Sequence, residues 1–184
     1  SSTVPPTWNA FDITVKNGYV YVVGEGTGKP LSIVDTTNKN IDSISLDAYA
    51  NRVLVSGNLL FVGDRNYHIQ IFDISSPIEP LLLSTYTTID GYPAAMAISG
   101  DNLFFAGANG VLEGIDISDP LNPTQFDVFN GLNTWDIFAK ENRIFASTND
   151  GLMVLKVVPE PTTLLLLGLG SLILRKKPVQ NTAL

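Results

Sequence analysis

The chain has no cysteine and only one histidine, His68. Without thiols there are no disulfides, no zinc–thiolate centres and no thiol nucleophile. Positive charge is scarce as well, because residues 1–158 hold 8 Lys and Arg against 17 Asp and Glu, a balance of −9. Such an acidic body repels phosphate backbones, so nucleic acid is not an expected partner. Apolar residues make up 45% of the 184, which is enough for one domain with a real core.

Recognisable catalytic and ligand-binding motifs are also lacking. His68 lies in the segment GDRNYHIQ between two predicted strands, and we interpret it as a loop histidine without a catalytic role. The acidic loops lack the D-x-D-x-D-G spacing of calcium sites, and GEGTG at 24–28 lacks the Lys-Ser/Thr and the helix of a phosphate loop. We therefore predict no metal, no cofactor and no catalytic residue, which favours a protein that is not an enzyme.

The chain does contain an internal repeat. Four similar stretches occur, NGYVYVVG (17–24), GNLLFVG (57–63), GDNLFFAG (100–107) and ENRIFAST (141–148), and we match their aromatics as Tyr21, Phe61, Phe105 and Phe145. A second set follows each stretch, LSIVD, IQIFD, LEGID and LMVLK, ending at Asp35, Asp73, Asp116 and Lys156. Both landmarks recur at nearly the same interval of about 40 residues, which indicates tandem structural units.

Each unit reads as short β-strands, rich in Val, Ile, Phe and Tyr and bounded by Gly, Asn, Asp and Pro. Several strands are apolar at consecutive positions, so both faces of each sheet must be covered. We predict an all-β fold, a β-propeller of about four visible four-stranded blades at approximately 9–47, 48–90, 91–131 and 132–158. A β-sandwich with similarly spaced strands is the alternative.

The fourth unit stops after LMVLKV and lacks an outer strand. The segment SSTVPPTW could complete it in a closed four-bladed ring, although its Pro5-Pro6 pair is poor strand material. We favour the second interpretation, in which the sequence is the C-terminal part of a larger propeller.

Two groups of polar residues recur with the repeat. The aspartates Asp35, Asp73 and Asp116 end a strand, where we expect them to accept backbone N–H groups of the following turn. The blade period places Asp12, Arg52, Met96 and Asp136 at one position of each first strand, the strand nearest the axis of a propeller. Asp12, Arg52 and Asp136 are therefore our candidate binding residues at one mouth of the channel; solvated or paired edge residues are the alternative.

These repeats resemble the LVIVD repeat, named for its pentapeptide. Leu31 to Asp35 match the pentapeptide, Gly57 to Phe61 match the second-strand pattern, and 74–77 and 117–120 match the Ile-Ser-x-Pro turn. The first unit departs with Thr36-Thr37-Asn38, and the fourth has Lys156 in place of the aspartate. The resemblance covers roughly residues 10–157 and implies a propeller of the kind found in exported and surface proteins, with no common reaction.

The C-terminal phrase VPEPTTLLLLGLGSLILRKK contains an uncharged run from Leu164 to Leu174. As a helix this run reaches roughly 17 Å, short of a hydrocarbon core of about 30 Å. We predict a short transmembrane-like helix at 162–174, followed by a basic cluster, Arg175, Lys176 and Lys177, that suits the cytoplasmic side.

This phrase resembles a PEP-CTERM sorting signal over 159–184, with Pro159, Glu160 and Pro161, then the apolar helix, then the basic cluster. The resemblance implies transient residence in the inner membrane of a Gram-negative bacterium. It further implies processing by an exosortase near the Pro-Glu-Pro motif and delivery to the cell surface or an extracellular matrix.

Three functions follow as hypotheses. The first is an exported, non-catalytic propeller that binds polysaccharide or another surface protein. The second is a secreted hydrolase or lyase acting on an extracellular polymer, with acids among the channel-facing aspartates. The third is a structural scaffold of a larger protein.

Overall fold

The computed structural model describes residues 9–28 and 30–157, where the regular secondary structure consists of fifteen β-strands. The predicted helix at 162–174, the Pro-Glu-Pro motif at 159–161 and the basic cluster at 175–177 lie outside the described residues. Within the described part, no helix is long and apolar enough to span a bilayer.

The strands form four antiparallel sheets, each built from consecutive strands. The first sheet contains β1 (Asn9–Lys16), β2 (Tyr19–Glu25), β3 (Pro30–Asp35) and β4 (Ile41–Ser45). The second contains β5 (Ala50–Ser56), β6 (Leu59–Asp64), β7 (His68–Asp73) and β8 (Leu81–Thr87). The third contains β9 (Pro93–Ser99), β10 (Asn102–Gly107), β11 (Val111–Asp116) and β12 (Thr124–Asn130). The fourth has three strands in the described part, β13 (Thr134–Lys140), β14 (Arg143–Thr148) and β15 (Gly151–Lys156).

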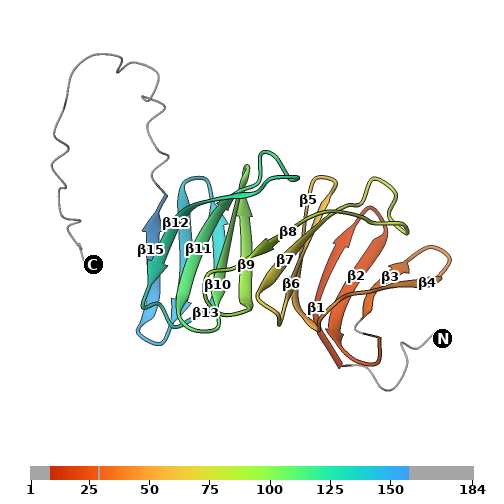
Figure 1. The fold of residues 1–184 in the computed structure, drawn as a ribbon, viewed down its shortest axis with the longest axis horizontal. Coiled ribbons are helices and arrows are strands. Elements are labelled where there is room, and N and C mark those ends of the chain that lie inside the picture. Colours follow the sequence, from red (N-terminus) through yellow and green to blue (C-terminus); the bar gives the residue numbers. More distant parts are fainter. Residues whose placement is uncertain (1–8, 29, 158–184) are drawn as a thin grey trace, which may run out of the picture.

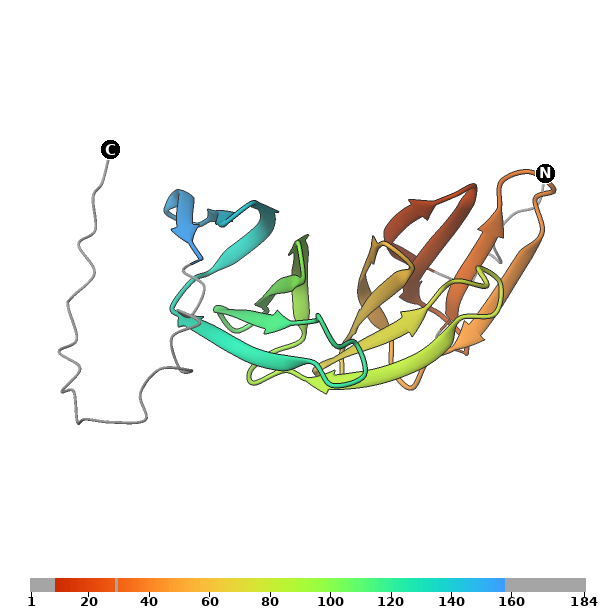
Figure 2. The ribbon, with the colours of Figure 1, turned by 90° about the horizontal axis from the view of Figure 1, so that it is seen from above.

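The sheets follow one another side by side along a curved row (Figure 1). Seen from above, the row is an open arc, with β8 and β12 on its outer side and the first and fourth sheets at its two ends (Figure 2). The first strands β1, β5, β9 and β13 are the inner strands, and each contacts the inner strand of the neighbouring sheet. This arrangement is that of propeller blades and excludes the sandwich alternative.

Apolar side chains fill the three junctions between sheets. We call the face of each sheet that points to the next sheet in the chain its forward face, and the opposite one its rear face. Tyr21, Phe61 and Phe104 lie on forward faces, and each is 3% exposed or less. Rear-face residues of the following sheet, such as Leu60 and Ile144, pack against these forward faces. The prediction that both sheet faces are covered is therefore confirmed at these junctions, which provide the hydrophobic stabilisation of the arc.

The register corrects two positions of the predicted repeat. The third residue of each second strand is Tyr21, Phe61, Phe104 and Phe145, so Phe104 and not Phe105 is the equivalent aromatic. By the same register, Ala95 and not Met96 is equivalent to Asp12, Arg52 and Asp136. Successive side chains of a strand point to opposite faces, so a slip of one residue exchanges the forward and rear faces.

Candidate functional site

The inner strands enclose an open hollow of about 500 Å³ at the end where each of them begins. We call it the inner hollow. All four inner strands line it, with Phe11, Asp12, Ile13 and Thr14 from β1, Arg52, Val53 and Leu54 from β5, Met96 from β9, and Trp135 and Asp136 from β13. The structure thus brings together Asp12, Arg52 and Asp136, the three candidate binding residues, and also places Met96 beside them.

A β-bulge shapes each inner strand next to this hollow. The register of each first pair shifts by one residue at Phe11, Asn51, Ala94 and Trp135, immediately before the positions of Asp12, Arg52, Ala95 and Asp136. A bulge leaves one residue unpaired, bends the strand and redirects the side chains around it. The four bulges therefore explain why Phe11 and Trp135 reach the mouth of the hollow and do not join the packed junctions.

Asp12 and Asp136 share one local contact and differ in the other. The Ile13 N–H donates to Asp12 Oδ1 at 2.9 Å, and the Ile137 N–H donates to Asp136 Oδ1 at the same distance. The second oxygen of Asp12, Oδ2, accepts the Val53 N–H of the next inner strand at 2.9 Å. Asp12 is therefore fixed across the first junction, whereas Oδ2 of Asp136 has no partner among the described residues.

Cationic and aromatic groups line the same mouth. Arg52 donates from Nη1 to the Asn51 carbonyl at 2.9 Å and makes no ion pair within the described part of the chain. Arg65, in the loop after β6, lies 4.9 Å above the centre of the Phe11 ring and donates from Nε to Asn51 Oδ1 at 2.9 Å. This cation–π contact and hydrogen bond support the Phe11 ring from outside the hollow.

The most exposed large hydrophobic residue at the mouth is Trp135, whose surface is 71% accessible, while Phe11 is 37% accessible. Trp135 Nε1 donates to Asn149 Oδ1 at 2.9 Å, which fixes the edge of the indole and leaves a face open. The sequence analysis missed both aromatics. Their signal was the shared pattern of an aromatic residue, Asp and Ile in 11–13 and 135–137, which the search for strand landmarks did not use.

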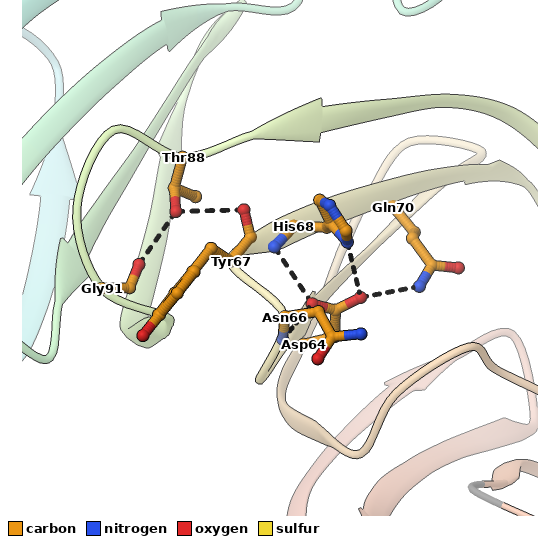
Figure 3. Close-up of polar contacts among 7 residues, drawn as sticks. All are labelled: Asp64, Asn66, Tyr67, His68, Gln70, Thr88 and Gly91. Carbon is orange, nitrogen blue, oxygen red and sulfur yellow. Dashed lines mark hydrogen bonds and ion pairs between the residues drawn. The ribbon is translucent and has the colours of Figure 1, made fainter.

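His68 does not line the inner hollow, and it is the first residue of β7, not the loop residue that the sequence analysis expected. It belongs to a cluster of polar contacts (Figure 3). The cluster is centred on Asp64, which is fully buried and ends β6. Asp64 Oδ1 accepts the N–H groups of Asn66 and His68 at 2.9 and 3.0 Å, and Oδ2 accepts Gln70 Nε2 at 3.0 Å. His68 Nδ1 lies 3.4 Å from the same Oδ2.

This arrangement gives His68 a structural contact, because it helps to surround a buried carboxylate that holds the loop between β6 and β7. A second contact fixes the same loop to the end of β8, where the Thr88 hydroxyl lies 3.1 Å from the Tyr67 carbonyl and 2.9 Å from that of Gly91 (Figure 3).

The recurring aspartates lie at the opposite end of the sheets. Asp35, Asp73 and Asp116 pair with the first residue of each second strand, far along the sheet from the hollow. Each accepts the N–H group two residues ahead at 2.8 Å, from Thr37, Ser75 and Ser118 respectively. Hydrogen bonds from the Ser75 hydroxyl and N–H lower the pKa of Asp73, which keeps this turn acceptor ionised.

No three acidic or histidine side chains converge as a metal site anywhere in residues 9–28 and 30–157. The candidate residues Pro159, Glu160, Pro161, Arg175, Lys176 and Lys177 fall outside those ranges.

Comparison with known families gives two matches. The LVIVD repeat matches residues 9–40, 47–88 and 90–130, which together exceed half of the chain. The PEP-CTERM protein-sorting motif matches residues 157–177. No curated protein matches the chain in sequence.

Solved structures with a similar fold include propellers of low sequence identity. The computationally designed Ika4 protein superimposes with a TM-score of 0.68 at 13% identity, covering 86% of this chain and 96% of that one. The β-propeller domain of Cps50 (Swd1) from Myceliophteria thermophila gives 0.69 at 14% identity, covering 83% and 55%. BamB from Moraxella catarrhalis gives 0.59 at 15% identity, covering 80% and 44%. The chain thus spans about half the length of the latter two, and the likeness concerns the fold alone.

Proposed function

The chain belongs to the LVIVD-repeat family of β-propellers and carries a PEP-CTERM sorting motif, and from this premise we propose that it is an exported, non-catalytic protein that binds a polyhydroxylated polymer in its inner hollow. The motif itself marks the chain for export and implies recognition by an exosortase. Transient residence in the inner membrane, cleavage near 159–161 and release to the surface or matrix complete the proposal.

The observation that carries the binding proposal is the exposed Trp135 at the rim of a hollow that also contains Phe11, Arg52 and Asp136. A large aromatic surface held open to water, with its edge fixed, is typical of an interaction site and contributes nothing to the core. The C–H face of a sugar ring packs well on such a surface. Its hydroxyls can donate to the free oxygen of Asp136 and accept from the Arg52 guanidinium.

The same geometry argues against the hydrolase or lyase alternative. Acid–base catalysis needs carboxylates whose oxygens can approach the reacting atoms. Both oxygens of Asp12 accept backbone N–H groups, which leaves Asp136 as the carboxylate with a free oxygen among the acidic residues that line the hollow. One free carboxylate next to an aromatic platform suits recognition better than a paired-acid mechanism.

A glycan array followed by calorimetry tests the proposal, with the 184-residue chain kept in a mild detergent because of its apolar tail. We expect at least one extracellular polysaccharide to bind. Trp135→Ala should weaken that binding by about tenfold or more, corresponding to about 1.4 kcal/mol. Phe129→Ala is the matched control, since Phe129 is 45% exposed on β12 and does not line the hollow. Equal effects of the two substitutions, or no bound glycan at all, would refute the assignment.

A further inference from the structure

Four exposed apolar residues lie on two turns and one outer strand, at the end of the sheets opposite the inner hollow. The turns follow β7 and β11 and span 74–80 and 117–123, with the matching sequences ISSPIEP and ISDPLNP. We call the four residues the turn-end patch: Ile78 in the first turn, Leu121 at the same position of the second, and Leu81 and Leu82 at the start of β8. They are 48%, 58%, 64% and 49% accessible, in that order.

A contact between neighbouring sheets brings the parts of the turn-end patch together. Ser84 of β8 donates from Oγ to the Pro120 carbonyl at 2.6 Å. The turn that carries Leu121 therefore lies against the strand that begins with Leu81. The patch belongs to the second and third sheets, each of which has a neighbouring sheet on both sides. Its exposure does not depend on the ends of the arc, and apolar residues grouped in this way are typical of an interaction site.

The turn that carries Leu121 is held in shape by its own polar groups. The Leu121 N–H donates to Asp119 Oδ1 at 3.1 Å, and Asn122 Nδ2 donates to Asp119 Oδ2 at 2.9 Å. The Leu121 N–H thus already has an acceptor, so its removal from water carries no penalty for an unpaired donor. The same two hydrogen bonds, that of Asn122 first, lower the pKa of Asp119, which stays ionised. Neither turn contains Lys or Arg, so the patch suits an apolar surface that is not anionic.

The path of the chain brings this end of the sheets toward a bilayer. Lys156, the last residue of β15, is equivalent to Asp73 and Asp116, so β15 ends on the side of the molecule where the two turns lie (Figure 1). Seven residue steps join Val157 to Leu164, where the uncharged run begins, and they span at most about 25 Å. If the hollow faced the bilayer, this link would have to run back along the sheet, which takes about 20 Å for the six residues of β15.

We propose that the turn-end patch rests on the surface of a zwitterionic bilayer while the tail holds the chain there, so that the inner hollow opens away from the membrane. This orientation rests on the transient membrane residence proposed above. The four apolar side chains enter the boundary between the headgroups and the acyl chains. Because the tail makes this contact intramolecular, a small apolar area is sufficient. In this orientation a polymer reaches the hollow while the chain is still held at the membrane.

Single-cysteine variants of the 184-residue chain report this orientation, since the chain has no cysteine. Leu121→Cys and Ile89→Cys are matched, because Leu121 is 58% and Ile89 59% accessible, and Ile89 follows β8 at the end of the sheets that carries the hollow. Each variant carries a nitrobenzoxadiazole label and is reconstituted in phosphatidylcholine vesicles with nitroxide-labelled headgroups. Quenching should be at least about threefold stronger at 121 than at 89, because the hollow end lies about 20 Å farther from the headgroups.

A label at Ser171→Cys, within the uncharged run, separates this orientation from the membrane residence on which it rests. Quenching at 171 together with equal quenching at 121 and 89 would overturn the orientation alone, and no quenching at 171 would overturn both.

A second measurement removes the apolar contact without altering the core. In a chain labelled at Leu82→Cys, the exposed residues Ile78 and Leu121 are both replaced by Ser, and quenching at 82 should decrease by about half or more. Ile89→Ser is the matched control and should leave quenching at 82 unchanged. The same quenching in the double variant and the control would contradict contact through the patch.

Discussion

Replacing Asp64 by Ala should destabilise the fold more than replacing any of the turn aspartates. The carboxylate is fully buried and accepts from three N–H donors. Of those, the Gln70 amide is 6% exposed and cannot turn to water, so losing its acceptor costs about 1–3 kcal/mol. The Asn66 and His68 N–H groups are closer to solvent, and each loss costs about 0.5–1 kcal/mol. We therefore expect a decrease of roughly 3 kcal/mol in the free energy of unfolding.

Equilibrium unfolding in urea, followed by circular dichroism, measures this difference. Asp116→Ala is the control, because Asp116 is partly exposed and accepts the single Ser118 N–H; it should cost about 1 kcal/mol. Asp64→Asn should lower the free energy of unfolding by an intermediate amount. Its amide keeps one acceptor oxygen, but its NH₂ group is a donor placed next to N–H groups that are donors themselves. If Asp64→Ala costs no more than Asp116→Ala, the cluster in Figure 3 does not hold the loop as we infer.

The remaining predictions concern pH and processing. Tyr86 donates to the buried Glu113 across the second junction, and burial, followed by that hydrogen bond and the Glu113 charge, raises the pKa of Tyr86 well above 10. The folded state therefore holds this proton more tightly than the unfolded state, and the stabilisation is complete below about pH 10 and declines as the pH rises further. Tyr86→Phe should lower the free energy of unfolding at pH 8, and it should reduce the decline of that free energy with pH above pH 10, both measured by urea titration. An unchanged decline above pH 10 would contradict the raised pKa of Tyr86. In a host with an exosortase, the wild-type protein should be released without its C-terminal tail, whereas the Glu160→Ala variant should retain the tail. Intact-mass spectrometry distinguishes the two products. Release of both proteins with the same truncation would contradict the sorting proposal.

Much of the fold could be predicted because the repeat contains residues whose structural role depends only on backbone groups close to them in the sequence. Asp35, Asp73 and Asp116 mark the same point of each unit, and the register places all three opposite the first residue of a second strand. An aspartate in a turn accepts hydrogen bonds from backbone N–H groups of the same turn, so its position in the repeat does not depend on how the surrounding side chains pack. The interval between these residues therefore follows the blades.

The one-residue error at Phe104 and Phe105 has a physical origin. Both rings are at most 3% exposed, because β10 lies between two neighbouring sheets and is covered on both faces. The usual alternation of apolar and polar residues, which reveals which side chain faces the core, is missing from such a strand. The same one-residue error made Met96 the predicted equivalent of Asp12. Only the pairing of β9 with β10 shows that the equivalent residue is Ala95.

The inner hollow was predictable only in part. The period placed Asp12, Arg52 and Asp136 on inner strands, and the structure brings them to one hollow. Trp135 escaped detection because a bulge, which depends on the pairing partner, redirects it to the mouth. The difference between Asp12, with both oxygens occupied, and Asp136, whose Oδ2 has no partner among the described residues, likewise depends on a contact from a neighbouring inner strand.

The most direct test of the binding proposal uses Trp135 as its own reporter. The chain has two tryptophans, so Trp8→Phe leaves Trp135 as the sole indole. We predict that titrating this variant with the polysaccharide selected on the array shifts the Trp135 emission to shorter wavelength and saturates at the calorimetric affinity, because the ring leaves water. Binding that saturates in calorimetry while the Trp135 emission stays unchanged would place the ligand elsewhere and contradict the account.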